Sequence, residues 1–159
     1  MSNIAEASAG AKAIRDEGVV GAVAFTVSDS DASLLRSGES LEEAIEAVMP
    51  FAPDALLINC SIPEMVTEGL KIVAKSGVRF GGYANGFTSV EALVPGSTVD
   101  LLSQRKDLGP AEYLEFVKDW MALGAEIIGG CCEIGPSHIA AIAEYCQREG
   151  IAITEHLAP

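Results

Sequence analysis

Four short apolar runs, each followed by a segment with helical character, constrain the fold of this chain most strongly. The runs lie at 19–27, 55–60, 78–83 and 125–130, and the helical segments that follow them lie at 40–48, 63–76, 110–123 and 136–149. An alanine-rich helix is expected before the first run, at 3–17. Continuous apolar, β-branched runs are typical of parallel strands buried on both faces. The sequence therefore predicts one helix and then four βα units in an α/β fold.

Local signals support the predicted helix boundaries. Ser40 and Glu43 form a capping box, and Pro63 and Gly77 stand at positions typical of the first residue of a helix and of the residue after its end. The stretch 84–108 is irregular, and loops of that length are usually functional or disordered. We expect one domain over 1–159, with a tail at 151–159, because the chain is long enough to bury a single core.

Two architectures fit repeated βα units with apolar strands. One is an open doubly wound sheet, and the other is part of a (β/α)₈ barrel, which takes about 250 residues and eight units when complete. Both place their chemistry at the carboxyl ends of the strands, so the periodicity alone leaves the choice open.

Cysteines end two of the predicted strands. Cys131 and Cys132 are adjacent and follow the apolar run that ends at 130, while Cys60 ends the run at 55–60. If the two strand ends are neighbours, three thiolates converge, and three soft ligands with an open fourth position describe a catalytic zinc site. The backbone freedom for the turn is expected from the glycines that flank the pair, namely Gly129, Gly130 and Gly135.

A simpler interpretation is that these cysteines are small core residues, because free cysteine is among the most buried residue types. Cys146 fits it best, since its spacing from Ile139 and Ile142 places it on an apolar helix face. The two histidines, His138 and His156, are expected to be solvated side chains rather than ligands.

The charge of the chain excludes several classes of partner. With 23 acidic and 10 basic residues the formal net charge is −13, so nucleic acid and anionic membrane surfaces would be repelled. No apolar run approaches the ~20 residues needed to span a bilayer. Four cysteines do not make a disulfide framework. We expect a soluble, cytoplasmic protein with free thiols.

The cysteine segments resemble the homocysteine S-methyltransferase family. The resemblance is carried by the run 129–132, by Gly135-Pro136 and His138-Ile139 after it, and by Asn59-Cys60 at the earlier strand end. The stretches 35–40 and 83–85 resemble further parts of the family, although Ala84 stands where the family usually has proline. The matching region is the second half of the family's sequence.

The resemblance implies half of a (β/α)₈ barrel, with this chain supplying strands five to eight. It implies zinc ligands at Cys60, Cys131 and Cys132, and a substrate pocket shaped by Asn59 and Asn85. The activity implied is zinc-dependent methyl transfer from a small-molecule donor to the thiol of homocysteine, giving methionine. No residue is assigned a catalytic role beyond these.

Half a barrel has consequences for assembly and for activity. Four parallel strands leave two unpaired edges and an apolar inner face, so we expect a homodimer or a complementing chain that carries the first half. One alternative is a non-catalytic half-barrel that associates but does not turn over substrate. A thiol redox role for Cys131 and Cys132 is a further alternative, and it is disfavoured because adjacent cysteines form only strained disulfides.

Overall fold

A four-stranded parallel sheet forms the centre of the molecule. The computed structural model describes residues 1–93 and 98–154. Its strands are β1 (Ala22–Phe25), β2 (Ala55–Asn59), β3 (Phe80–Tyr83) and β4 (Ile127–Ile128), in the spatial order β1-β2-β3-β4, and every neighbouring pair is parallel. The predicted α/β class and the predicted number of strands are confirmed.

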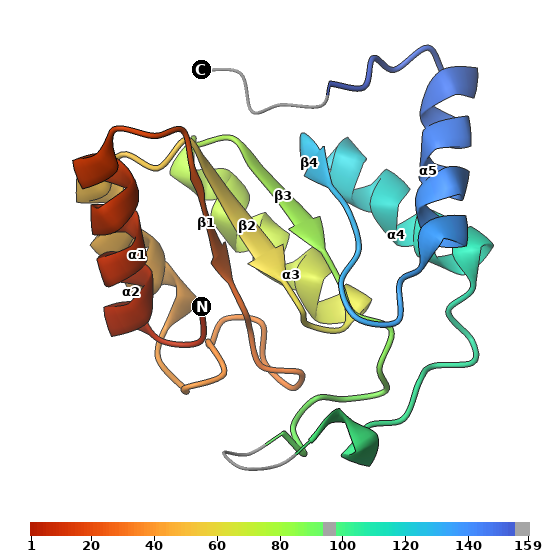
Figure 1. Ribbon diagram of the computed structural model, residues 1–159, viewed down its shortest axis with the longest axis horizontal. Coiled ribbons are helices and arrows are strands. Elements are labelled where there is room, and N and C mark those ends of the chain that lie inside the picture. Colours follow the sequence, from red (N-terminus) through yellow and green to blue (C-terminus); the bar gives the residue numbers. More distant parts are fainter. Residues whose placement is uncertain (94–97, 155–159) are drawn as a thin grey trace.

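Helices connect the strands and cover the sheet on one side. They are α1 (Ile4–Glu17), α2 (Leu41–Val48), α3 (Pro63–Val73), α4 (Pro110–Ala122) and α5 (Pro136–Arg148), with short 3₁₀ turns at Met49–Phe51, Ala74–Ser76 and Val99–Leu101. In Figure 1, α3 lies behind β2 and β3, while α1 and α2 flank one end of the sheet and α4 and α5 the other. Within the described residues, no helix is long and apolar enough to cross a membrane.

The strand order decides between the two predicted architectures. A doubly wound sheet reverses its strand order at a switch point and carries helices on both faces. Here each strand pairs with the strand before it in the chain, and right-handed crossovers then leave their helices on one face. The sheet is therefore a section of barrel wall, as the family resemblance implied.

Alternation along the strands separates the helix-facing core from the inner face of this wall. Val23 and Phe25 on β1 are fully buried, as are Leu56 and Ile58, which pair with them on β2. Gly82 belongs to the same layer, because a Cβ there would lie 2.7 Å from Val66 of α3. The residues between these positions face the barrel interior.

The first strand is shorter than predicted. Val19 and Val20 were placed in it, yet their side chains are 57% and 47% exposed and β1 begins at Ala22. Ala22 lies opposite Ala55, where β2 begins, so residues before Ala22 have no strand beside them. Gly21 still bonds to Asp54, which precedes β2, but Val19 and Val20 come before the sheet rather than joining it.

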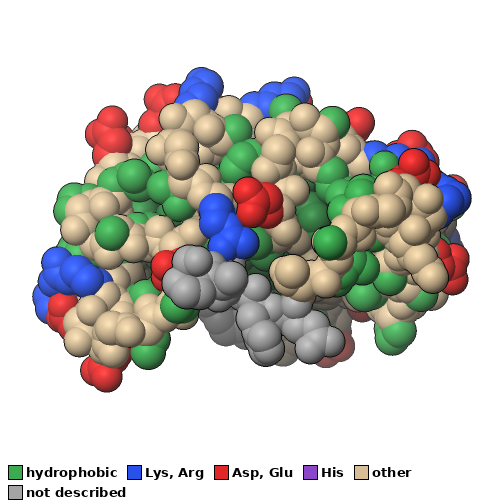
Figure 2. Space-filling model, turned by 90° about the horizontal axis from the view of Figure 1, so that it is seen from above, with side chains coloured by type: hydrophobic (Ala, Val, Ile, Leu, Met, Phe, Trp, Pro, Cys, Tyr) green, Lys and Arg blue, Asp and Glu red, His purple; other side chains and the backbone are tan. Residues whose placement is uncertain are grey.

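Exposed apolar side chains gather at the amino-terminal ends of the strands. Besides Val19 and Val20, they include Leu123, which follows α4, and Ile151 and Ile153, which follow α5. Figure 2 views this side from above, and hydrophobic side chains are visible there between charged groups. The cysteine-bearing turns lie at the opposite, carboxyl ends of the strands.

The predicted irregular stretch 84–108 is tied down at both ends. Its two arms meet at an antiparallel bridge between Phe87 and Gln104, and the Arg105 N–H donates to the Gly86 carbonyl at 2.7 Å. The Arg105 guanidinium also binds both carboxylate oxygens of Glu64, at 2.8 Å each. This stretch is therefore anchored against the first turn of α3, close to Cys60 in the chain.

Candidate metal site

Three cysteines from two distant parts of the chain meet at the carboxyl end of the sheet. The Sγ atoms of Cys60, Cys131 and Cys132 all lie within 4.8 Å of one another. Cys60 follows the last residue of β2, and the adjacent pair lies beyond β4, two strands away in the sheet. The sequence-based expectation that these three thiols converge is met by this geometry.

Cys60 stands on a tight turn with unusual backbone geometry. Its φ is +49°, a left-handed conformation that costs a non-glycine residue about 1 kcal/mol or more. Hydrogen bonds hold the turn: the Cys60 N–H donates to the Tyr83 carbonyl at 3.1 Å, and the Asn85 side chain donates to the Cys60 carbonyl at 2.9 Å. The turn aims the thiol away from the strand direction and toward the second cysteine segment.

The cysteine pair is held by the segment that follows β3. The Cys131 N–H donates to the Ala84 carbonyl at 2.9 Å, and the Gly86 N–H donates to the Cys132 carbonyl at 2.8 Å. The next residue, Glu133, has a φ of +66°. Residues 84–86 thus form a bridge that touches both cysteine-bearing turns.

The glycines near the pair serve a different purpose from the one predicted. None of Gly129, Gly130 and Gly135 has a positive φ, and the left-handed residues of the two turns are Cys60 and Glu133. Gly130 is needed for close approach, because a Cβ there would lie 2.2 Å from the Ile134 side chain. The prediction that these glycines supply backbone freedom for the turn was therefore wrong, and Gly130 is required because a side chain would not fit there.

The two asparagines named from the sequence occupy different settings. Asn59, the last residue of β2, is half-buried and its Oδ1 accepts a hydrogen bond from the Thr26 hydroxyl at 3.0 Å. Asn85 is fully buried, and its amide is engaged on both sides, donating to the Cys60 carbonyl and accepting from the Phe87 N–H at 3.0 Å. Asn59 is therefore next to Cys60 in the chain but bonds to Thr26 of the preceding βα unit, whereas Asn85 supports the Cys60 turn from within the protein.

Burial and the neighbouring sulfur keep the thiols of Cys60 and Cys132 protonated in the absence of a cation, because both raise the pKa. Burial, followed by the neighbouring Cys131 thiol, raises the pKa of Cys60 to about 12. The pKa of Cys132 is also raised, first by burial and then by Cys131. A thiolate here is stable only with a compensating positive charge, and a coordinated metal ion supplies it.

The donor set fits zinc. Tetrahedral coordination at a Zn–S distance of about 2.3 Å separates two thiolate sulfurs by about 3.8 Å. The Sγ atoms of Cys131 and Cys132 are 3.9 Å apart. Cys132 is exposed while Cys60 and Cys131 are half-buried, so the cluster is open to solvent on one side, as a fourth ligand from substrate requires.

Two tyrosines near the cluster were not singled out as functional from the sequence. Tyr83, at the end of β3, has a pKa that is raised chiefly by burial and also by Cys131 and Cys60. Tyr113 on α4 is fully buried, and its hydroxyl lies between the ends of β3 and β4. Tyr83 could have been found by strand alternation, but nothing in the local sequence indicated that Tyr113 reaches the strand ends.

The remaining cysteine and the histidines have mixed outcomes. Cys146 is buried on α5, as predicted. The prediction that His138 is solvated was wrong: it is 9% exposed, accepts at Nδ1 from the Gly135 N–H and contacts the Leu108 carbonyl through Nε2 at 3.1 Å. Burial arises because its ring packs edge-on against Tyr113. His156 lies outside the described residues.

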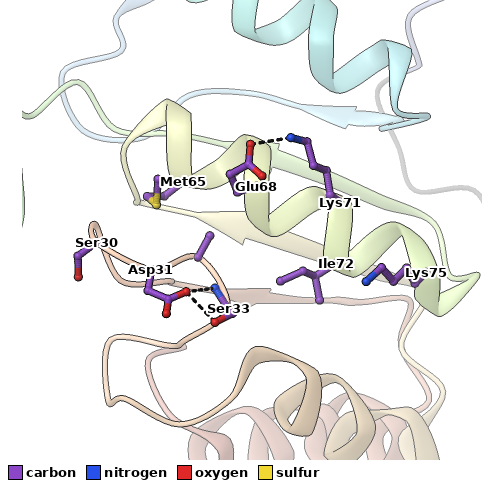
Figure 3. Close-up of a pocket in the computed structure, with 9 residues that line it drawn as sticks. Ser30, Asp31, Ser33, Met65, Glu68, Lys71, Ile72 and Lys75 are labelled. Atoms are coloured by element: carbon purple, nitrogen blue, oxygen red, sulfur yellow. Dashed lines mark hydrogen bonds and ion pairs between the residues drawn. The ribbon is translucent and has the colours of Figure 1, made fainter.

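A separate groove lies between α3 and the loop that follows β1. It has a volume of about 400 Å³ and includes Asp31, which accepts two hydrogen bonds from Ser33, and Lys71, which pairs with Glu68 at 2.6 Å. Figure 3 shows these side chains on the helix side of the sheet. None of the cysteines or asparagines predicted from the sequence lines it, so it is distinct from the sulfur cluster.

Comparison with known proteins places this geometry in a family. Similar proteins include homocysteine S-methyltransferase 1 of Brassica oleracea var. italica, 26% identical over 160 residues, and selenocysteine Se-methyltransferase of the same plant, 32% identical over 154 residues. The matches cover 93% and 89% of this chain, but only 44% and 40% of those proteins. The chain thus spans less than half the length of these curated relatives.

A solved structure agrees with the architecture, and a family model matches most of the chain. The metallated homocysteine methyltransferase MmuM of Escherichia coli superimposes with a TM-score of 0.69 at 23% identity, covering 91% of this chain and 42% of that one. At that identity the likeness shows the fold alone. The family model described as homocysteine S-methyltransferase matches residues 1–146. The chain belongs to the homocysteine S-methyltransferase family.

Proposed function

We propose that this chain carries the zinc-binding half of a homocysteine S-methyltransferase, with Cys60, Cys131 and Cys132 as the metal ligands. The observation that carries the proposal is the convergence of the three sulfurs within 4.8 Å at the carboxyl end of the strands, where barrel enzymes hold their active sites. Zinc bound there would keep a substrate thiol as a thiolate near neutral pH, and the thiolate is the nucleophile.

The chain's own residues would hold and shape that site. Asn59, which precedes Cys60 and bonds to Thr26, is proposed as a substrate contact, and Tyr83, its partner on the neighbouring strand, would line the same pocket. Asn85 is proposed to act on the pocket through its bond to the Cys60 carbonyl, because its side chain is fully buried. By the family resemblance, the residues that hold the amino-acid end of homocysteine belong to the other half of the barrel.

We further propose that the inner face of the sheet pairs with a second half-barrel, either a separate chain or another copy. Ala22 and Ala24 on β1 and Ile127 on β4 are half-buried on or beside that face, and no strand covers the outer edge of β4 within residues 1–93 and 98–154. Closing a barrel removes both open edges of the sheet. Sedimentation should detect a complex, and a dilute monomer without exposed apolar surface would contradict this part of the proposal.

Metal analysis tests the site. The purified chain should hold about one zinc per copy of the cysteine cluster, and Cys60→Ser, Cys131→Ser and Cys132→Ser should each lose it. Cys146→Ala is the matched control, because that thiol is buried on α5 away from the cluster and should not affect zinc content. Equal zinc in all five proteins would remove the assignment.

The competing function is a non-catalytic half-barrel that binds metal without turnover. The observation that favours it is coverage, since the chain spans 40–44% of the compared methyltransferases. Methionine formation from homocysteine, measured with a panel of methyl donors, separates the two. The enzyme requires product above the level of the Cys131→Ser variant, whereas the non-catalytic form gives none with any donor or added half-barrel.

A further inference from the structure

The ladder between β3 and β4 continues past the last paired residues of the sheet, with one interruption. Gly82 lies opposite Ile128, and two residues further on the Cys131 N–H donates to the Ala84 carbonyl at 2.9 Å. In a parallel ladder the companion bond to that one runs from the Ala84 N–H to the Gly129 carbonyl.

A side-chain hydroxyl replaces that companion bond. The Ala84 N–H donates to the Tyr113 hydroxyl at 3.1 Å, and the same hydroxyl donates to the Gly129 carbonyl at 2.8 Å. The oxygen of Tyr113 thus spans the gap between the two strand ends immediately before the cysteine pair. Both backbone groups are satisfied only because the hydroxyl is present.

The ring that carries this hydroxyl is fixed in place. Tyr113 is fully buried and packs edge-on against Trp120 and His138, with ring centroids 5.7 Å apart in each case. Trp120 in turn donates to the Thr67 hydroxyl of α3 at 2.8 Å. Contacts with α3 and α4 therefore fix the position of the hydroxyl at the strand ends.

We infer that Tyr113 is a positioning residue for the sulfur cluster, with its hydroxyl setting where the Cys131–Cys132 turn leaves the sheet and so how far that pair stands from Cys60. This inference rests on the proposed zinc site. It concerns a side chain that touches neither metal nor substrate and acts through Ala84 and Gly129. The Ala84 N–H donates to the Tyr113 hydroxyl and the Ala84 carbonyl accepts from the Cys131 N–H, so the hydroxyl and the first cysteine bind the two backbone groups of one residue.

Tyr113→Phe is the test, because it removes one oxygen and keeps the ring. The ring would still separate the strand ends, so the Ala84 N–H and the Gly129 carbonyl would be left without a partner. We expect amide hydrogen exchange at Ala84 and Cys131 of the metal-free protein to rise about three- to ten-fold, as loss of one hydrogen bond predicts. Metal affinity should fall about 10- to 100-fold, as for other residues that support ligands.

Cobalt is the spectroscopic probe. Its thiolate charge-transfer absorption should weaken or shift in Tyr113→Phe. Tyr145→Phe is the matched control, because the Tyr145 hydroxyl has no hydrogen bond within the described residues and its ring stacks only with Lys118 and Arg148. Val117→Ala controls for stability: this buried α4 residue should lower the unfolding midpoint and leave the cobalt spectrum unchanged.

The outcomes separate the inference from the proposed function. Unchanged exchange at Ala84 and Cys131 together with an unchanged cobalt spectrum would overturn the role of Tyr113 while leaving the zinc site intact. A wild-type chain that binds neither zinc nor cobalt would overturn the proposed site, and with it the claim that Tyr113 positions metal ligands. If Val117→Ala altered the cobalt spectrum as much as Tyr113→Phe does, Tyr113 would act only as a core residue and its positioning role would be overturned.

Discussion

Metal binding at this cluster should depend steeply on pH, because the metal must displace protons from thiols whose pKa is raised. Burial and the adjacent sulfur raise the pKa of Cys60 to about 12, and the pKa of Cys132 is raised as well. Both thiols are therefore protonated throughout the range from pH 6 to 8 in the metal-free protein. A ligating cysteine must be deprotonated, so binding one metal ion releases at least these two protons.

The sign and size of the effect follow from linkage. Each proton released on binding strengthens apparent affinity tenfold per pH unit, and each factor of ten is worth about 1.36 kcal/mol. Two protons give a Kd that falls about 100-fold between pH 6 and pH 7, or ~2.7 kcal/mol. Affinity is lost as pH falls and gained as it rises, because the metal-free state binds the extra protons.

Calorimetry in buffers of different ionisation enthalpy counts the protons directly, and competition with a chromophoric chelator gives the Kd at each pH. Cys60→Ser, which is expected to lose zinc, should release no protons when zinc is added, while Cys146→Ala should release the same number as the wild type. Release of less than one proton by the wild type between pH 6 and 7 would mean that the thiols are not the metal ligands.

Two further predictions concern the stability of the sheet and of the helix packing next to the cluster. Gly81→Ala should destabilise the protein by about 3 kcal/mol or more, because the new Cβ would lie 1.9 Å from the Ile127 carbonyl oxygen, and urea unfolding measures it. Gly129→Ala is its control and should cost little, since the nearest atom there is 3.5 Å away. Trp120→Phe should lower the free energy of unfolding by ~1–3 kcal/mol through loss of its bond to Thr67, and a change below 0.3 kcal/mol, roughly the error of such measurements, would contradict this.

The broad architecture follows from local patterns. Apolar runs and helix-start signals were enough to predict four βα units, and the N-cap at Ser40 and the first helical residue at Pro63 are where they were expected. Strand order was not predictable from periodicity, since open sheets and barrels use the same unit, and it came from the family resemblance. The first strand was predicted too long for a different reason. An apolar run becomes a strand only where a neighbouring strand supplies hydrogen-bonding partners, and Val19 and Val20 have none in the sheet.

The convergence of Cys60, Cys131 and Cys132 was predictable from the sequence. Cysteines at strand ends can be read from the chain because parallel strands share one carboxyl edge. The residues that support the cluster were harder to predict from the sequence. Tyr113 is 18 residues from Cys131, on a helix whose apolar pattern already explains a buried aromatic, and His138 was misjudged because its partner carbonyl, Leu108, lies in a loop of irregular sequence.

X-ray absorption spectroscopy of the zinc-loaded protein identifies the ligands directly, because it reports the atoms bound to the metal. Three sulfur ligands at about 2.3 Å and one lighter ligand are expected without substrate, and a fourth sulfur should appear when homocysteine is added. Each of Cys60→Ser, Cys131→Ser and Cys132→Ser should lose one sulfur or the metal altogether. A first shell made of nitrogen and oxygen alone would contradict the account.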